Sequence, residues 1–215
     1  MEKRFYKTSS GFSMPYVFYR QGPADGGKLP VIVYLHGTDG CGSDPQHIFD
    51  IETMASQITG GKLTIEGSMI LLTPQCPEGH RWSDVMSEVR ELIEFIIETE
   101  NADPDRISLT GCSLGGMGTF SMAIEYPRMF SAAVPVCGSI ASPEDAAVMS
   151  VMPVRIYHGT EDRGMGFSVV DAAKVIKEAG GDCELIMLPG EGHEIRHVYY
   201  DRKLAEWMIS QKRKG

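Results

Sequence analysis

The segment at residues 111–115, Gly-Cys-Ser-Leu-Gly, has the Gly-x-Ser-x-Gly spacing of a nucleophilic serine on a tight turn. A strand-like run, residues 106–110, comes directly before it, and helix-like residues follow it. A strand that turns sharply into a helix strains the central residue, and only glycine fits on either side. We therefore predict that Ser113 projects from the strand end as a nucleophile. The backbone N–H of Leu114 is then expected to stabilise an oxyanion.

Two further strand-like runs each lead to a residue that can activate this serine. Residues 154–157 lead to Asp162, and residues 185–188 lead to His193. A serine is a poor nucleophile unless a base accepts its proton and a third group orients that base. The acid and then the histidine, each after a later strand, is the chain order that follows such a serine turn. We predict Ser113, Asp162 and His193 as a catalytic triad.

Five other residues are weaker candidates for these roles. Glu161 comes from the same loop as the predicted acid but is expected to point the other way. His36 and His158 each precede a glycine at a strand end, where a histidine more often packs or bonds the backbone. His197 is expected on the final helix as a surface group. Cys112 occupies the variable position of the serine turn, where the side chain points into the packing, so we do not expect it to be the nucleophile.

A second oxyanion donor is expected from the loop after an early strand. The apolar run at residues 31–35 is followed by His-Gly-Thr-Asp-Gly at residues 36–40. Its glycines let the backbone curl close to a substrate oxygen. We predict the N–H of Thr38 as this donor, and an ordinary glycine-rich turn remains the alternative interpretation.

The elements around these residues predict an α/β fold, with a mostly parallel central sheet flanked by helices. The apolar run at residues 31–35 has no alternation, as expected for a strand buried on both faces. Further strands are expected at residues 69–72, 107–109, 132–136, 154–157 and 185–188. Apolar residues at helical spacing predict helices around residues 48–58, 85–97 and 200–208. Residues 5–6 and 17–19 are expected to form an antiparallel edge.

The length favours a single domain over residues 1–215, and the short segment at 137–152 leaves no room for a large lid domain.

The overall composition limits the class of protein. The chain has 215 residues and a net charge of −9, and this acidic balance argues against nucleic acid or an anionic membrane as partners. Its five cysteines lack metal-ligand spacing, and there is no glycine-rich phosphate loop, so we predict neither a metal nor another cofactor. The N-terminus lacks the apolar core of a signal peptide, and no apolar run approaches the length of a membrane span. We expect a cytoplasmic enzyme, although removal of a leader would leave the same sequence.

These motifs resemble those of small single-domain carboxylesterases of the α/β-hydrolase superfamily. The resemblance is greatest to the branch of phospholipase/carboxylesterase enzymes, acyl-protein thioesterases and feruloyl or polysaccharide-deacylating esterases. Besides the serine turn, it rests on residues 35–37, residues 73–77 with Trp82 after them, residues 158–162 and residues 190–193. The resemblance implies that Trp82 lies near the acyl or alcohol pocket, where a flat ring face would suit an aromatic or sugar ring. The chain departs from the pattern at residues 163–166, Arg-Gly-Met-Gly, where such enzymes often have an apolar residue soon after the acid.

The function that these residues predict is hydrolysis of carboxylic esters through an acyl-enzyme on Ser113. A site without a large lid favours small or polymer-borne acyl groups, so the expected partner is a small-molecule or polysaccharide-linked ester. A serine peptidase or an acyl-protein thioesterase on the same fold remains an alternative, as does a non-catalytic ligand-binding relative. A covalent serine probe separates the enzymes from the binding protein.

Overall fold

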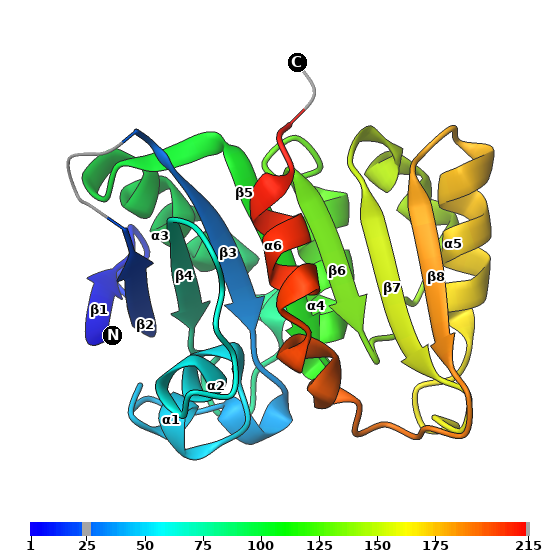
Figure 1. Cartoon of the computed structure of the whole chain (residues 1–215), viewed down its shortest axis with the longest axis horizontal. Coiled ribbons are helices and arrows are strands. Elements are labelled where there is room, and N and C mark those ends of the chain that lie inside the picture. The colour runs from blue at the N-terminus through cyan, green and yellow to red at the C-terminus, as the bar shows by residue number, and fades with distance from the viewer. Residues whose placement is uncertain (23–26, 214–215) are drawn as a thin grey trace.

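The structure, a computed structural model, describes residues 1–22 and 27–213. In these residues eight strands form one sheet with helices on both faces (Figure 1). The strands are β1 (Glu2–Lys7), β2 (Ser13–Gln21), β3 (Leu29–Leu35), β4 (Met69–Pro74), β5 (Ala102–Cys112), β6 (Ala132–Val136), β7 (Val154–Gly159) and β8 (Cys183–Leu188). Their order in space is β1-β2-β4-β3-β5-β6-β7-β8. The predicted α/β fold with a mostly parallel sheet is confirmed.

The strand directions divide the sheet into an antiparallel edge and a parallel body. β1 pairs with β2 and β2 with β4 in antiparallel register, whereas β4, β3, β5, β6, β7 and β8 run parallel to their neighbours. Every residue of β3 is buried, as the apolar run without alternation at residues 31–35 predicts, and every residue of β4 and β6 is buried as well. Because the strands from β3 onward are parallel, the loops after them gather at one edge of the sheet, where side chains from distant segments can meet.

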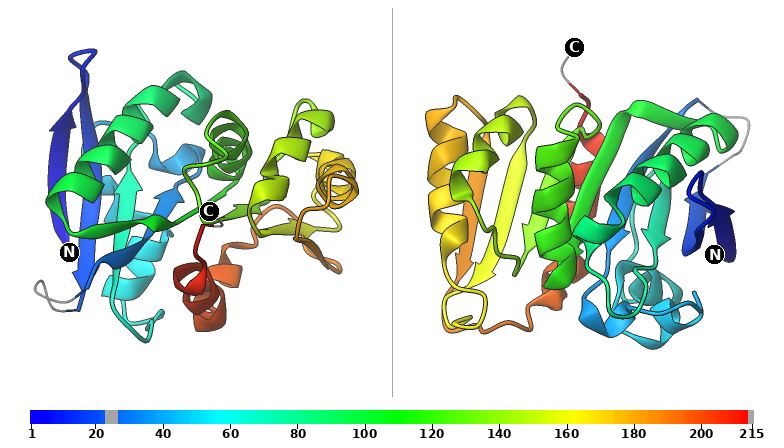
Figure 2. Two further views of the ribbon diagram at one scale, coloured as in Figure 1. Left: turned by 90° about the horizontal axis from the view of Figure 1, so that it is seen from above. Right: turned by 180° about the vertical axis from the view of Figure 1, so that it is seen from behind.

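Two layers of helices cover the two faces of the sheet, as the views in Figure 2 show. α3 (Met86–Thr99), α4 (Leu114–Glu125) and α5 (Ser168–Glu178) pack on one face. α1 (His47–Asp50), α2 (Met54–Thr59) and α6 (Arg202–Ser210) pack on the other. Each layer has its own apolar core, with Leu92 and Phe120 in the first and Ile48 and Leu204 in the second. The sheet therefore lies between two layers of helices.

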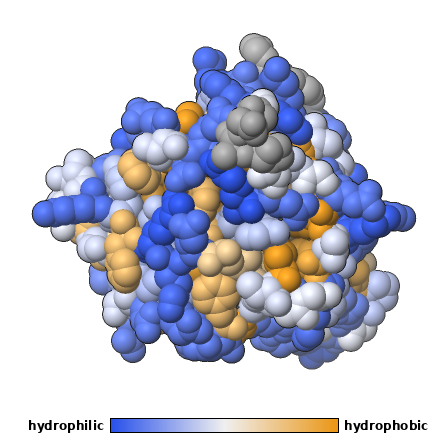
Figure 3. All heavy atoms as spheres, turned by 60° about the vertical axis from the view of Figure 1, so that its left-hand side comes forward, coloured by the Kyte–Doolittle hydropathy of each residue, from blue (hydrophilic) through white to orange (hydrophobic). Residues whose placement is uncertain are grey.

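The outer edge of the antiparallel strands carries mostly polar side chains. Figure 3, in which the β1 side of the molecule comes forward, shows a surface that is mainly hydrophilic with separate apolar patches. β1 itself carries Glu2, Lys3, Arg4 and Lys7. Charged residues on an edge strand disfavour its pairing with a strand of another chain.

Two expected helices differ from the structure in extent. The helix predicted around residues 48–58 is split into α1 and α2, because the side chain of Thr53 accepts a hydrogen bond from the N–H of Ser56 and starts a new helix there. The final helix starts only at Arg202, after the cap Asp201, whose side chain accepts from the N–H of Lys203. His197 consequently lies in a preceding 3₁₀ helix, η4 (Arg196–Tyr200), and not on the final helix.

None of the helices within residues 1–22 and 27–213 combines the length and the apolar content that crossing a bilayer requires.

Candidate active site

Three side chains from three loops form a continuous chain of hydrogen bonds at the carboxyl edge of the sheet. Ser113 follows β5, Asp162 follows β7 and His193 follows β8. Nε2 of His193 lies 2.8 Å from Oγ of Ser113, and Nδ1 of His193 lies 2.7 Å from Oδ2 of Asp162. The three residues predicted as a triad are therefore in mutual contact, in the geometry that a nucleophile, a base and an orienting acid require.

The backbone around Ser113 is strained in the way that the glycine spacing predicts. Ser113 has φ 60° and ψ −119°, a combination that non-glycine residues rarely adopt. A Cβ at Gly111 would lie 2.5 Å from the carbonyl oxygen of Leu35, and one at Gly115 would lie 1.9 Å from that same oxygen. The turn from β5 into α4 is thus possible only with glycine at both positions, and it holds the serine at the N-terminus of a helix.

The charge state of Asp162 determines which atoms in this chain of hydrogen bonds carry protons. Burial alone would raise the pKa of Asp162, but hydrogen bonds from His193, Cys137 and the N–H of Met165 outweigh it and hold that pKa below its usual value. The carboxylate is therefore ionised near neutral pH and can only accept hydrogen bonds. Nδ1 of His193 consequently donates to Asp162, which leaves Nε2 free to accept the hydroxyl proton of Ser113.

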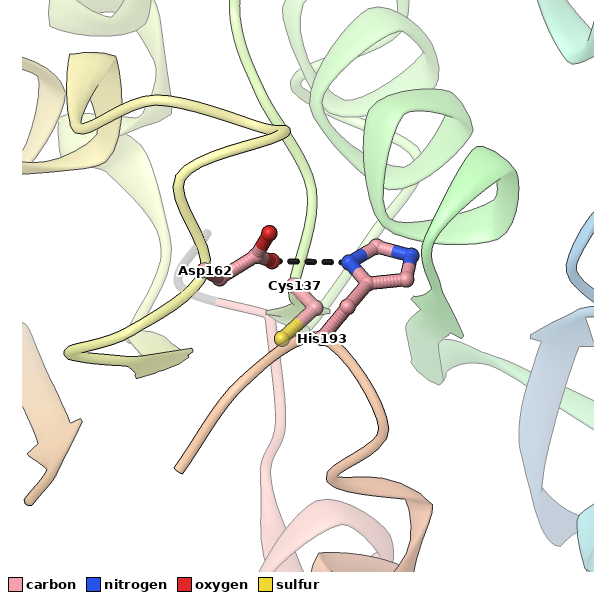
Figure 4. A group of neighbouring side chains, drawn as sticks. All are labelled: Cys137, Asp162 and His193. Atoms are coloured by element: carbon pink, nitrogen blue, oxygen red, sulfur yellow. Dashed lines mark hydrogen bonds and ion pairs between the residues drawn. The ribbon is translucent and has the colours of Figure 1, made fainter. Parts of the chain in front are cut away.

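Cys137 is a neighbour of the triad that sequence reasoning missed. It follows β6 with φ 43°, is fully buried, and lies beside Asp162 and His193 (Figure 4). Within residues 1–22 and 27–213 these three form one group whose potential metal-ligand atoms all lie within 4.8 Å of one another. Two ligands of a tetrahedral Zn²⁺ lie about 3.3 Å apart, whereas Asp162 and His193 approach to 2.7 Å. The distance of 2.7 Å fits a hydrogen bond between Asp162 and His193, and these two side chains would have to move apart to bind a metal ion together.

The weaker candidates for acid, base and nucleophile point elsewhere. The side chain of Glu161 is 56% exposed and lies 3.6 Å from Arg163. The buried ring of His158 has Nε2 at 3.9 Å from Oδ2 of Asp162 and packs edge-on against the ring of Phe167. His197 is a surface group, as expected, and lies 3.3 Å from Glu191.

Cys112 and Ser113 are neighbours in sequence but face different environments. Cys112 belongs to the core between the sheet and α6, and burial raises the pKa of its thiol to about 12. A thiol with so high a pKa is almost entirely protonated at neutral pH and is a poor nucleophile. Its placement agrees with the prediction that this side chain points into the packing.

The loop after β3 lies against the serine turn. It forms the short 3₁₀ helix η1 (Thr38–Gly40), and the carbonyl oxygen of His36 accepts a hydrogen bond of 3.0 Å from Nε1 of Trp82. Nε2 of His36 accepts from the N–H of Cys76, also at 3.0 Å. His36 thus binds the backbone, as its position at a strand end predicts. These bonds hold the segment that carries Thr38, whose role as an oxyanion donor stays a prediction.

Trp82 lies beside a cavity that Leu114, the residue after Ser113, also lines, but its orientation differs from the one that the resemblance suggests. It starts the 3₁₀ helix η2 (Trp82–Asp84) and borders a cavity of about 360 Å³. Only 1% of the residue is exposed, because the ring lies against His36 and against Gly118 of α4. The expectation of an open flat face for a substrate ring is therefore wrong in this structure, and Trp82 supports the loop after β3.

Comparison with known proteins identifies the family. The sequence model of the dienelactone hydrolase family matches residues 78–202, more than half of the chain. The chain belongs to the dienelactone hydrolase family. The matched residues include Ser113, Asp162 and His193, whereas the loop at residues 36–40 lies outside them. Membership of this family agrees with the predicted hydrolase class.

Two curated relatives of this member of the dienelactone hydrolase family carry the names of hydrolases. Carboxylesterase SOBER1 of Arabidopsis thaliana is 33% identical over 144 residues, which cover 62% of this chain and 61% of that protein. A Methylorubrum extorquens protein with the provisional name carboxymethylenebutenolidase is 26% identical over 213 residues, covering 87% of this chain and 70% of that protein. The chain thus spans about three fifths of the length of the plant carboxylesterase.

Solved structures share the fold. A thermostable esterase superposes with a TM-score of 0.82 at 22% identity, covering 99% of this chain and 63% of that one. A mutant feruloyl esterase module from Clostridium thermocellum, complexed with sinapinate, superposes with a TM-score of 0.74 at 16% identity and covers 100% and 90%. At these identities the likeness shows the α/β-hydrolase fold that the motifs predict.

Proposed function

We propose that this chain is a serine esterase that hydrolyses carboxylic esters of small or polymer-borne acyl groups through an acyl-enzyme on Ser113. The observation that carries the proposal is the unbroken hydrogen-bond chain from Ser113 through His193 to the ionised Asp162. Family membership and the names of the relatives support ester bonds as the substrate.

The proposed reaction starts with attack of Ser113 Oγ on the ester carbonyl carbon. Nε2 of His193 takes the hydroxyl proton as the carbon–oxygen bond forms, and Asp162 stabilises the resulting imidazolium. The tetrahedral intermediate collapses, the alcohol leaves with the proton from His193, and the acyl group stays on Ser113. Water then attacks this acyl-enzyme with His193 as base, which releases the acid and regenerates the serine. These steps need no cofactor.

The negative oxygen of the intermediate requires donors that are in place before the reaction. Leu114 is the first residue of α4, where backbone N–H groups have no partner within the helix. Thr38 follows Gly37 at the start of η1, in the loop that packs on the serine turn. We assign the two oxyanion donors to the backbone N–H groups of Leu114 and Thr38.

The acyl group is assigned to the cavity beside the serine turn. Its volume is about 360 Å³, and Leu114, Met117, Phe120, Ile124 and Ile140 give it an apolar lining. Ser139, Ala141, Ser142 and Asp145, in and before the 3₁₀ helix η3 (Pro143–Val151), form one wall. Apolar walls of this size suit short aliphatic or single-ring acyl groups, which gain about 0.8 kcal/mol per buried CH₂. A second hollow of about 440 Å³ beside Asp162, His193 and Arg163 can take the alcohol.

A cyclic ester is a second candidate substrate, favoured by the family match and by the carboxymethylenebutenolidase name of one relative. Opening a lactone uses the same attack by Ser113. The difference is that the alcohol stays attached to the acyl group after the first step.

The proposal is tested with a fluorophosphonate probe and a panel of nitrophenyl esters and lactones. The wild-type protein and Cys112→Ala should be labelled and active, whereas Ser113→Ala should lose labelling and at least about 10³-fold in kcat. Activity should be highest for acetyl to butyryl or single-ring acyl esters. Near wild-type turnover by Ser113→Ala would refute the assignment of Ser113 as the nucleophile. A rate that climbs steadily to dodecanoyl esters would refute the small acyl pocket and favour a thioesterase.

A further inference from the structure

One ion pair joins the two loops that carry the proposed machinery. Nη1 of Arg196, three residues past His193, lies 2.6 Å from Oδ2 of Asp39, the residue after Thr38. The two residues are 157 positions apart in the sequence. The side chain of Arg196 is 15% exposed and that of Asp39 is 39% exposed, so the pair is only partly screened by water.

The surroundings of this pair leave it little freedom. A Cβ on Gly37 would lie 3.3 Å from Nη2 of Arg196, 2.8 Å from Oδ1 of Asp39 and 3.6 Å from the carbonyl oxygen of Cys112. The guanidinium therefore lies in a notch between the loop after β3 and the serine turn. On the far side, Nε2 of His47 is 2.7 Å from the carbonyl oxygen of Asp39. Asp39, the middle residue of η1, is thus held from outside through both its carboxylate and its carbonyl oxygen.

We propose that Arg196 and Asp39 are positioning residues that set the distance between the oxyanion donor Thr38 and the base His193. The inference rests on the proposed function. Neither residue belongs to the triad, and both act through their neighbours in sequence. A charge-assisted hydrogen bond of this length is strong and directional, and an arginine held by its planar fork orients the attached loop better than a lysine can.

Loss of this ion pair should weaken the stabilisation of the transition state. If the pair is broken, the loop after β3 relaxes and the Thr38 N–H no longer points at the site where the oxyanion forms. Complete removal of one oxyanion donor costs about 10² to 10³ in kcat, so displacement without removal should cost roughly tenfold to hundredfold. Substrate binding in the cavity lined by α4 does not involve this loop, so KM should change little.

The test compares Arg196→Gln, Asp39→Asn and their double variant on a short-chain nitrophenyl ester. Each single variant should lose roughly tenfold to hundredfold in kcat with KM nearly unchanged, and the double variant should lose no more than the worse single variant. The affinity for a boronic acid, which forms a tetrahedral adduct on serine, should fall by the same factor as kcat. Arg196→Lys, which keeps the charge, should recover part of the loss.

A matched control comes from an ion pair at the opposite edge of the sheet. Nη2 of Arg20 on β2 lies 3.0 Å from Oε2 of Glu100, and these side chains are 20% and 19% exposed. Arg20→Gln should lower the melting temperature without changing kcat. The proposal is overturned if Arg196→Gln and Asp39→Asn behave like Arg20→Gln, or if boronate affinity does not follow kcat. If Arg196→Gln does not fold, the more exposed Asp39→Asn gives the answer. Undiminished activity of Ser113→Ala would instead refute the proposed function.

Discussion

The buried ring of His36 should make the stability of this protein depend on pH. The ring is fully buried, Nδ1 lies 2.7 Å from the carbonyl oxygen of Gly37, and Nε2 accepts from the N–H of Cys76 at 3.0 Å. Because a backbone N–H can only donate, Nε2 carries no proton, and Nδ1–H donates to Gly37. A second proton would face the N–H of Cys76. Burial accordingly lowers the pKa of His36 to about 4.

The sign and size of the effect follow from proton linkage. In the unfolded chain the ring takes up a proton near pH 6.5, whereas in the folded protein it does so only near pH 4. The unfolded state therefore binds more protons between these values, and the free energy of unfolding falls as the pH is lowered through this window. The gap corresponds to about 3 kcal/mol in all, most of which is lost by pH 4.5.

Urea unfolding of wild type and His36→Gln at pH 7.5 and pH 4.5 measures this effect. Glutamine keeps an acceptor and a donor but does not titrate, so the wild type should lose about 2–3 kcal/mol more than the variant on acidification. Other groups titrate alike in both proteins and cancel. The exposed His80→Gln serves as control and should keep the wild-type pH dependence. Equal losses in wild type and His36→Gln would refute the assignment of a neutral buried ring.

Two further predictions concern the acid and the tryptophan. Asp162→Asn should lower kcat/KM by about 10⁴-fold because the orienting acceptor of His193 is lost, whereas Glu161→Gln should stay near wild type; equal damage in the same ester assay would mean that the acid is misassigned. Trp82→Phe removes the donor to the buried carbonyl of His36, so it should cost about 1–3 kcal/mol of stability and lower the melting temperature by about 2–4 °C for each kcal/mol. It should change KM for aromatic and aliphatic esters equally; an increase in KM confined to aromatic esters, at an unchanged melting temperature, would show that the ring contacts substrate.

The parts of the site that the sequence predicts are those that local rules determine. Apolar runs identify parallel strands, and parallel strands bring their following loops to one edge, so Ser113, Asp162 and His193 meet although 80 residues separate the serine from the histidine. The glycines of the serine turn are equally local, since the backbone of a strand-to-helix turn decides which side chains fit. The break between α1 and α2 shows where prediction from helical periodicity fails. Periodicity continues through residues 48–58, but a cap at Thr53 outweighs it.

The contacts that could not be predicted depend on how loops meet in space. Arg196 comes three residues after His193 and Asp39 directly after Thr38, yet neither position carries a motif that links it to the other. Cys137 is similar, because only the packing of β6 beside β7 brings its thiol to Asp162. Side-chain contacts between loops are set by the whole fold, so a single sequence contains no periodic or spacing signal for them.

Trp82 shows that a residue can lie next to a cavity without exposing its ring to it, a difference that a sequence motif does not reveal. Its position next to the cavity agrees with the resemblance, but the direction of the ring is fixed by two neighbours that lie far away in the sequence. Nε1 must reach the carbonyl oxygen of His36, and a Cβ on Gly118 would lie only 2.6 Å from the Cβ of Trp82. The indole therefore holds the loop after β3 against α4. A substrate ring in the cavity must instead meet the partly exposed side chains of α4, Met117 and Ile124, whose apolar surfaces accept aliphatic and aromatic acyl groups alike.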